Sequence, residues 1–197
     1  MAHKMRVRRA LARGILRTTR WRLSGDIPPA GILVGAPHTS QWDWAVMLLI
    51  SWANGARVQA LISHTYFSGP MGWVLRKTGG VPLDRSNPGA TIRALVKQAE
   101  SGEPFLLTIA AEGTRSKGEY WKPGFYRIAQ QTGLPISLGF VDGPTRSLGM
   151  GPTFHPTGDV VKDMDFVRAF YADKRGIKPE NRTEPRLREE SEQSGSS

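Results

Sequence analysis

The chain has 197 residues, no cysteine and a formal net charge of +10 at pH 7. This length suits one globular domain, and a composition of 39% hydrophobic and 22% charged residues permits a packed core and argues against wholesale disorder. The missing cysteine excludes disulfides, thiolate metal sites and a cysteine nucleophile, whereas the positive charge points to an anionic partner such as nucleic acid, a membrane surface or a phosphorylated substrate.

The excess charge stands almost entirely at the N-terminus. Residues 1–22 contain eight Lys or Arg residues and no acidic residue, whereas residues 23–172 contain thirteen basic and eleven acidic residues. The remaining residues, 173–197, contain six of each sign. The body of the protein is therefore nearly neutral, and the anionic partner is expected at the N-terminal arm, residues 1–22.

The side chains of this arm follow a helical pattern at 100° per residue. One arc contains Arg6, Arg9, Arg13, Arg17 and Arg20, and the opposite arc contains Val7, Leu11 and Ile15. This pattern predicts a basic amphipathic helix that lies in a membrane interface; the alternative is a surface helix whose three apolar residues dock on the core of the domain. No secretory signal and no apolar run near the ~20 residues of a spanning helix are visible. Membrane contact is therefore expected to be peripheral, at the cytoplasmic face.

Strand and helix patterns alternate along residues 23–176. Strands are expected at 31–36, 57–63, 81–83, 105–110, 135–141 and 153–155, and helices at 41–53, 69–77, between Asn87 and Gly102, at 124–132 and at 160–174. Such alternation is typical of a single α/β domain with a mostly parallel central sheet flanked by helices. Residues 177–197 have almost no apolar side chains and are expected to form a disordered tail.

His38 stands between the predicted strand 31–36 and the predicted helix 41–53. Open α/β folds place ligands at the edge where strands end. If His38 lies in the turn, Asp43 in the first helical turn can reach one imidazole nitrogen and make the other a general base. The alternative role of Asp43 is local, because Ser40 as N-cap would place it where the carboxylate of a capping box stands.

Further loops carry charged side chains at predicted strand ends. Arg85 follows one predicted strand and Arg115 follows another, on the side of the sheet expected for His38. Two guanidinium groups there would bind a phosphate bidentately, and Lys122 would add a third positive charge. Taken singly, each loop is better explained as a surface turn with local ion pairs, but together with His38 they predict a site.

Short motifs follow one another in order between residues 30 and 141. They are H-x4-D at His38 and Asp43, a segment from Gly80 to Arg85 that ends in Asp-Arg, E-G-T-R at Glu112, Gly113, Thr114 and Arg115, and a strand start at Leu134-Pro135-Ile136. This ordered set resembles the glycerolipid acyltransferases, the family that includes the 1-acylglycerol-3-phosphate acyltransferases. The chain departs from the family pattern at Ala110-Ala111, where Phe-Pro is usual, and at His64, near which many members carry a lysine. The short body is similar to that of compact bacterial members.

The resemblance implies an O-acyltransferase that needs no cofactor and no metal, with acyl-CoA or acyl-carrier protein as donor substrate. His38 would be the general base on a glycerol hydroxyl, oriented by Asp43. The acceptor's phosphate would be bound by residues of the second and third motifs, namely Arg85, Glu112, Gly113, Thr114 and Arg115. His64 and Lys122 are candidates for further substrate contacts. The expected acceptor is 1-acylglycerol-3-phosphate, with glycerol 3-phosphate or another lipid alcohol as the alternative.

A function of another class, a basic nucleic-acid-binding module, is suggested by the sequence pI of about 10.4. The nearly neutral body and the lack of a motif that reads DNA or RNA argue against it. A serine hydrolase is also disfavoured, because the chain has no G-x-S-x-G elbow. The expected partners are therefore acyl-CoA, a phosphorylated glycerol lipid and an anionic membrane surface, and not nucleic acid.

Overall fold

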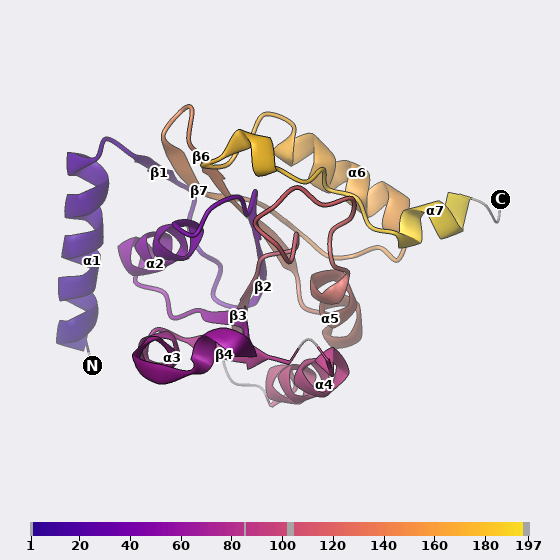
Figure 1. Cartoon of the computed structure of the whole chain (residues 1–197), viewed down its shortest axis with the longest axis horizontal. Coiled ribbons are helices and arrows are strands. Elements are labelled where there is room, and N and C mark those ends of the chain that lie inside the picture. Colours follow the sequence, from indigo (N-terminus) through magenta and orange to yellow (C-terminus); the bar gives the residue numbers. More distant parts are fainter. Residues whose placement is uncertain (1, 85, 102–104, 195–197) are drawn as a thin grey trace.

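The computed structural model describes residues 2–84, 86–101 and 105–194 (Figure 1). Within this part of the chain, seven strands form one sheet in the order β1-β7-β6-β2-β5-β3-β4. The strands are β1 (Arg22–Ser24), β2 (Gly31–Ala36), β3 (Gln59–Ser63), β4 (Gly80–Leu83), β5 (Leu106–Ile109), β6 (Ile136–Asp142) and β7 (Ser147–Phe154). Arg85, a predicted phosphate ligand, lies outside the described residues.

Five neighbouring strands, from β6 to β4, run parallel, which confirms the α/β domain with a mostly parallel sheet. Strand β7 is antiparallel to β6, and β1 is parallel to β7, so these two strands run opposite to the others. The connection from β6 to β7 is a short turn, which permits a hairpin but not the long crossover that a parallel neighbour requires. The predicted strand at 153–155 is therefore the end of a longer antiparallel strand, and β1 was not predicted.

Helices cover both faces of the sheet (Figure 1). One face carries α1 (Ala2–Thr18), α2 (Asp43–Asn54) and α3 (Gly69–Lys77), and the other carries α4 (Pro88–Ala99), α5 (Gly124–Thr132) and α6 (Val160–Tyr171). The chain crosses the sheet in one direction from β2 to β4 and returns through β5 to β6, so right-handed crossovers place the two sets of helices on opposite faces. Short 3₁₀ helices η1 (His64–Phe67) and η2 (Pro179–Asn181) and helix α7 (Glu189–Ser194) complete the described elements.

Strand β2 lies in the middle of the sheet, and its side chains alternate between the two faces, as the pleat of a strand requires. Ile32 and Val34 are fully buried in the larger hydrophobic core, whereas Leu33 belongs to a separate cluster. Because both neighbours of β2 are parallel to it, its carboxyl end opens onto the central edge of the sheet. His38 is the second residue after that end.

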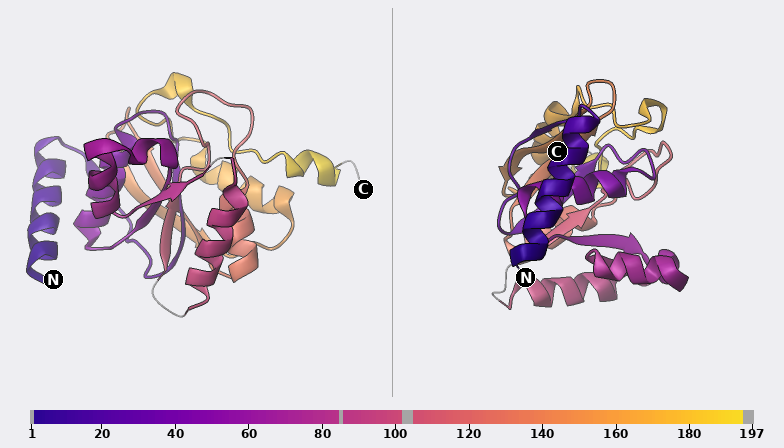
Figure 2. Two further views of the ribbon diagram at one scale, coloured as in Figure 1. Left: turned by 60° about the horizontal axis from the view of Figure 1, so that its bottom comes forward. Right: turned by 90° about the vertical axis from the view of Figure 1, so that its left-hand side faces the viewer.

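Helix α1 packs beside α2 (Figure 2), and it docks through residues that the sequence pattern did not single out. Ala12 and Leu16 are buried in a cluster with residues of α2, β6 and β7, whereas Val7, Leu11 and Ile15 are 46%, 57% and 45% exposed. The alternative that these three residues dock on the core is therefore wrong. Since the docked residues lie roughly 120° around the helix from the apolar stripe, α1 has a docked face, a basic face and an exposed apolar face. Within the described residues, no helix is both long and apolar enough to cross a bilayer.

Residues 177–191 pack on the domain, so the expectation of a disordered tail is wrong for this segment. Thr183 and Leu187 are each 1% exposed, and the Arg168 guanidinium of α6 lies 2.6 Å from the Glu190 carboxylate. The segment returns along α6 to α7 (Figure 1). The order of this segment is not visible in the sequence, because polar contacts rather than an apolar pattern hold most of it in place. Such contacts leave no periodic signal in a sequence.

Candidate active site

A histidine and an aspartate are in contact at the connection between β2 and α2. His38 Nδ1 lies 3.0 Å from Asp43 Oδ2, and their side chains are 19% and 9% exposed. The same carboxylate oxygen accepts a hydrogen bond of 2.8 Å from the Ser40 N–H. The predicted contact between the two side chains is present, and so is a local contact of the kind that a capping box makes. The contact with His38 depends on His38 lying in the turn before α2 rather than in the helix.

This contact determines which imidazole nitrogen is available for chemistry. A carboxylate can only accept hydrogen bonds, so in the neutral ring the proton is assigned to Nδ1 and the lone pair to Nε2. Asp43 thereby fixes the tautomer and the ring orientation, and it stabilises the imidazolium that forms when Nε2 takes up a proton. The pair has the arrangement of a general base with its orienting carboxylate.

Glu112 contacts the backbone of this turn rather than facing solvent. Its side chain is 1% exposed; Oε1 accepts a hydrogen bond of 2.5 Å from the His38 N–H, and Oε2 accepts one of 3.1 Å from the Thr183 N–H. Burial raises the pKa of the Glu112 carboxyl, while these two backbone donors act in the opposite direction. The structure therefore places Glu112 as a support of the turn that carries His38, which differs from its predicted role as a phosphate ligand.

Thr183 belongs to a C-terminal strap, residues 176–187, that sequence reasoning missed. Its hydroxyl oxygen accepts a hydrogen bond of 2.8 Å from the Gly118 N–H, and its carbonyl accepts one of 3.3 Å from Trp121 Nε1. On the other side, Thr39 Oγ1 accepts a hydrogen bond of 3.0 Å from the backbone N–H of Lys178. The strap thus connects the loop after β5 to the turn that carries His38. No motif in the sequence marked it.

The third motif places a guanidinium on the loop after β5. Arg115 Nη1 donates a hydrogen bond of 3.2 Å to Tyr66 Oη, and its guanidinium lies 5.6 Å from the centroid of that ring. Gly113 has a φ of +68°, and a Cβ added there would lie 2.8 Å from Lys122 Cγ. The loop therefore needs glycine at this point, because the Lys122 side chain lies against the Gly113 backbone.

The remaining predicted contacts lie further along the edge of the sheet or on its surface. Thr114 is exposed, and its hydroxyl oxygen accepts a hydrogen bond of 3.3 Å from the Ser116 N–H. His64 is in η1, where Nδ1 lies 3.3 Å from the Leu83 carbonyl oxygen and 3.9 Å from Asp84 Oδ1. His64 thus stands beside the end of β4, and the structure shows no contact that joins it to the His38–Asp43 pair.

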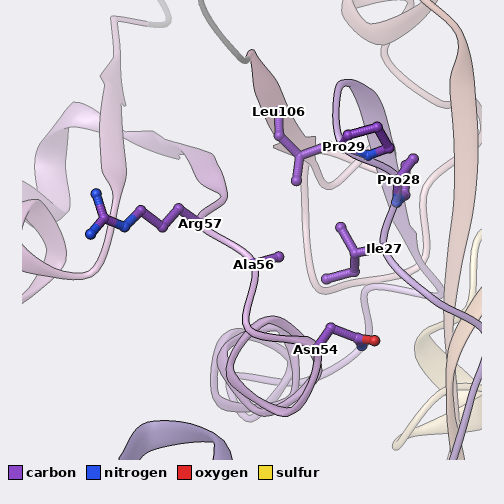
Figure 3. A pocket seen from close by; sticks show the side chains of 7 residues that line it. All are labelled: Ile27, Pro28, Pro29, Asn54, Ala56, Arg57 and Leu106. Carbon is purple, nitrogen blue, oxygen red and sulfur yellow. The ribbon is translucent and has the colours of Figure 1, made fainter. Parts of the chain in front are cut away.

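A cavity of about 530 Å³ lies at the other edge of the sheet (Figure 3). Leu106, the first residue of β5, lines it together with the segment 27–29 and with Asn54, Ala56 and Arg57. The amino end of β5 pairs with the amino end of β2, so the cavity and His38 are separated by the length of a strand. His38 and this cavity therefore lie at opposite edges of the sheet. Among the described residues, no group of three His, Asp or Glu side chains gathers in a way that could hold a metal ion.

Comparison with known proteins identifies the class to which this fold and site belong. The model of the Acyltransferase family matches residues 20–137, which is more than half of the chain and includes the H-x4-D and E-G-T-R segments. The chain therefore belongs to the Acyltransferase family.

A solved structure with a similar fold is PlsC, the 1-acyl-sn-glycerophosphate (LPA) acyltransferase from Thermotoga maritima. The two chains share 18% sequence identity, with 78% of this chain and 70% of that chain covered and a TM-score of 0.54. At this level of identity the likeness shows a common fold. A search of the curated proteins finds no match.

Proposed function

We propose that this protein transfers an acyl group from a thioester donor, acyl-CoA or acyl-carrier protein, to a glycerol hydroxyl of a phosphorylated lipid. The expected acceptor is 1-acylglycerol-3-phosphate, and glycerol 3-phosphate or another lipid alcohol is the alternative. The observation that carries the proposal is the 3.0 Å contact between His38 and Asp43 at the end of β2. Membership of the Acyltransferase family supports the reaction class, and the activity of PlsC as a 1-acyl-sn-glycerophosphate acyltransferase supports the choice of acceptor.

In the proposed reaction, His38 Nε2 removes the proton from the acceptor hydroxyl as that oxygen attacks the thioester carbonyl carbon. Asp43 stabilises the resulting imidazolium. The tetrahedral intermediate collapses with cleavage of the C–S bond, and the departing thiolate takes the proton back from His38. The products are an ester and a free thiol, and no protein side chain is acylated, which agrees with a chain that has no cysteine.

The acceptor's phosphate is proposed to bind at the loop after β5. Arg115 has the planar, forked donor geometry that suits phosphate, and Lys122 adds a second positive charge. The contact with Tyr66 orients the Arg115 guanidinium, while Gly113 and Thr114 shape the loop. Arg85 remains a predicted ligand of the same phosphate, and His64 a candidate contact near it.

Product analysis with a panel of acceptors tests this proposal. With palmitoyl-CoA or oleoyl-CoA, we expect thiol release and the formation of phosphatidic acid from 1-acylglycerol-3-phosphate, detected by mass spectrometry. The matched control is 1-acylglycerol, which lacks the phosphate. The kcat/KM for 1-acylglycerol is expected to be lower than that for 1-acylglycerol-3-phosphate by at least about tenfold, because a charge-assisted hydrogen bond contributes roughly 1.5–3 kcal/mol. Equal rates would contradict the phosphate site, and no transfer to any glycerol acceptor would contradict the proposal as a whole.

We further propose that α1 attaches the enzyme to anionic membranes as a peripheral protein: its basic residues attract the lipid headgroups, and its exposed apolar residues Val7, Leu11 and Ile15 enter the interface. Changing Arg6, Arg9 and Arg13 together to Gln is expected to weaken binding to phosphatidylglycerol-containing vesicles about a hundredfold, because each basic residue near an anionic surface contributes ~1 kcal/mol. Co-sedimentation measures this affinity. All three side chains are exposed, so the substitutions should leave the docked face of α1 intact.

The control for this experiment removes the same charge from the opposite face. Exposed cations on α4, α6 and the strap are available for it, namely Lys97, Lys162 and Arg186. Changing these three to Gln is expected to reduce vesicle binding only slightly. Equal losses in the two triple variants would show that net charge, and not α1, governs binding. Tight binding to DNA by the unaltered protein would instead favour the nucleic-acid alternative.

A further inference from the structure

Most of the exposed large apolar side chains belong to a few elements in the N-terminal half of the chain. The described residues include nine of them: Val7, Leu11, Ile15, Trp42, Tyr66, Met71, Trp73, Val74 and Phe166. The first eight belong to α1, η1, α3 or the residue just before α2, and only Phe166 lies on α6. Large apolar patches on a soluble surface mark contact sites, and the α1 stripe accounts for only three of these side chains.

Helix α3 presents an apolar surface of its own, which we call the α3 patch and define as Met71, Trp73 and Val74. These side chains are 57%, 65% and 36% exposed. The opposite side of the helix packs on the domain through Gly72 and Leu75, which are buried. The helix is therefore firmly seated while its tryptophan and methionine point to solvent. Tryptophan is the residue that membrane interfaces favour, because its ring is apolar and its N–H is polar.

The α3 patch follows in the chain directly after η1, which contacts the candidate site. Helix η1 leads into α3, and Tyr66 of η1 contacts the Arg115 guanidinium of the proposed phosphate site. At the entry to α2, Trp42 is 71% exposed and immediately precedes Asp43. A membrane or partner surface in contact with both Tyr66 and Trp42 would therefore lie next to the turn that carries His38.

The charge around the α3 patch suits an anionic bilayer. No acidic residue stands between Asp43 and Asp84. Within this segment Lys77 Nζ lies 5.9 Å from the centroid of the Trp73 ring, and both side chains are exposed. Residues 1–83 contain eleven basic and two acidic residues, whereas residues 84–197 contain sixteen and fifteen. Cations beside exposed aromatic rings can face lipid headgroups while the rings enter the interface.

We infer that the α3 patch is a second membrane contact, which enters the interface of an anionic bilayer on the side of the protein where the His38 edge of the sheet lies. The inference rests on the proposed lipid acyltransferase function, and it adds that the domain has a fixed orientation on the bilayer. Attachment through α1 alone would leave the domain free to rotate about one helix. A second contact at α3 holds the His38 edge against the bilayer, so the glycerol headgroup of the acceptor reaches His38 while its acyl chain stays in the membrane.

A single fluorescent label tests this inference, because the chain has no cysteine of its own. Met71→Cys carrying an NBD group reports on the α3 patch, Val7→Cys on α1, and Phe166→Cys on the opposite face. With vesicles of phosphatidylcholine and phosphatidylglycerol, the label at position 71 is expected to shift its emission to the blue and to be quenched by nitroxide-labelled lipids. The label at position 166 is expected to remain in water.

The three labels separate the possible outcomes. A response at position 7 without one at position 71 would overturn the second contact and leave the α1 attachment standing. A response at position 71 that grows with protein concentration in the absence of vesicles would show that a second copy of the chain covers the patch, and would also overturn the inference. The acyltransferase function itself is tested separately, by measuring thiol release with a short-chain, water-soluble acceptor. Absence of release there would contradict the proposed function and not the second membrane contact.

Activity gives a second readout. In the double variant Met71→Ser/Trp73→Ser, the ratio of the rate on vesicle-borne acceptor to the rate on soluble acceptor is expected to fall about tenfold, because two apolar side chains no longer enter the interface. Raising the salt concentration should not restore the ratio, since apolar burial is not screened as charge is. The matched control, Phe166→Ser, is expected to keep the ratio of the unaltered protein, and an unchanged ratio in the double variant would refute the inference.

Discussion

Replacement of His38 by Ala is expected to lower the rate of acyl transfer by about 10²–10⁴-fold, the usual contribution of a positioned general base. The fold should survive, because Glu112 contacts the backbone N–H of residue 38 and not its side chain. Alanine keeps that N–H, and the imidazole it removes is 19% exposed rather than part of a core. Thiol release measures the rate, and circular dichroism with a denaturant titration measures the fold.

Two further variants sharpen this test. His155 is exposed at the end of β7, and His155→Ala is expected to leave the rate unchanged. Asp43→Asn should give an intermediate loss, because an amide can still contact Nδ1 but does not supply the charge that stabilises the imidazolium. A His38→Ala protein that is folded and retains the full rate would contradict the general-base role. Such a result would leave membership of the family untouched.

Glu112→Gln is expected to impair catalysis through the position of His38. The two carboxylate oxygens of Glu112 accept hydrogen bonds from the backbone N–H groups of His38 and Thr183. Glutamine has one oxygen and one NH2 group, so one buried N–H must face another donor, which costs about 1–3 kcal/mol in the free energy of unfolding. The turn that holds His38 should shift as a result, and kcat is expected to fall.

The division of this effect between kcat and KM distinguishes two roles for Glu112. If Glu112 supports the catalytic turn, kcat falls while the KM for the acceptor changes little. If it binds the acceptor's phosphate, as the motif predicted, KM is the constant that changes. Glu119→Gln is the matched control, since it removes one exposed carboxylate from the same connection; it is expected to change neither stability nor kcat. A stable Glu112→Gln protein with full kcat would contradict the supporting role.

The candidate site shows which contacts a sequence can predict. His38 and Asp43 are five residues apart, so the geometry of one turn decides their contact. The partners of Glu112 are 74 and 71 residues away. Any backbone N–H can satisfy a buried carboxylate, so nothing in the sequence around Thr183 distinguishes it as the second partner. The strap became part of the site only when the fold brought the two segments together.

Helix α1 also combines features that the sequence predicts with a contact that it does not predict. Its helical form and its basic arc follow from residue spacing. However, apolar residues occupy two arcs of the helix, and spacing alone does not tell which arc docks. The surface offered by α2 and the β6–β7 hairpin selects Ala12 and Leu16, whose side chains permit a close approach. Val7, Leu11 and Ile15 are consequently left exposed.

The sequence by itself determined the α/β class, most of the strands and helices, the order of the motifs, and the concentration of positive charge before the domain. These features depend on local spacing and composition, which a single chain displays directly. Only the tertiary structure decided that β7 turns back as a hairpin strand, that Glu112 supports the His38 turn from within the protein, that residues 177–191 pack as a strap and helix, and that α3 exposes an apolar surface. Each of these depends on contacts between distant segments, whose energies are set by shape and by hydrogen-bond pairing and not by any repeat in the sequence.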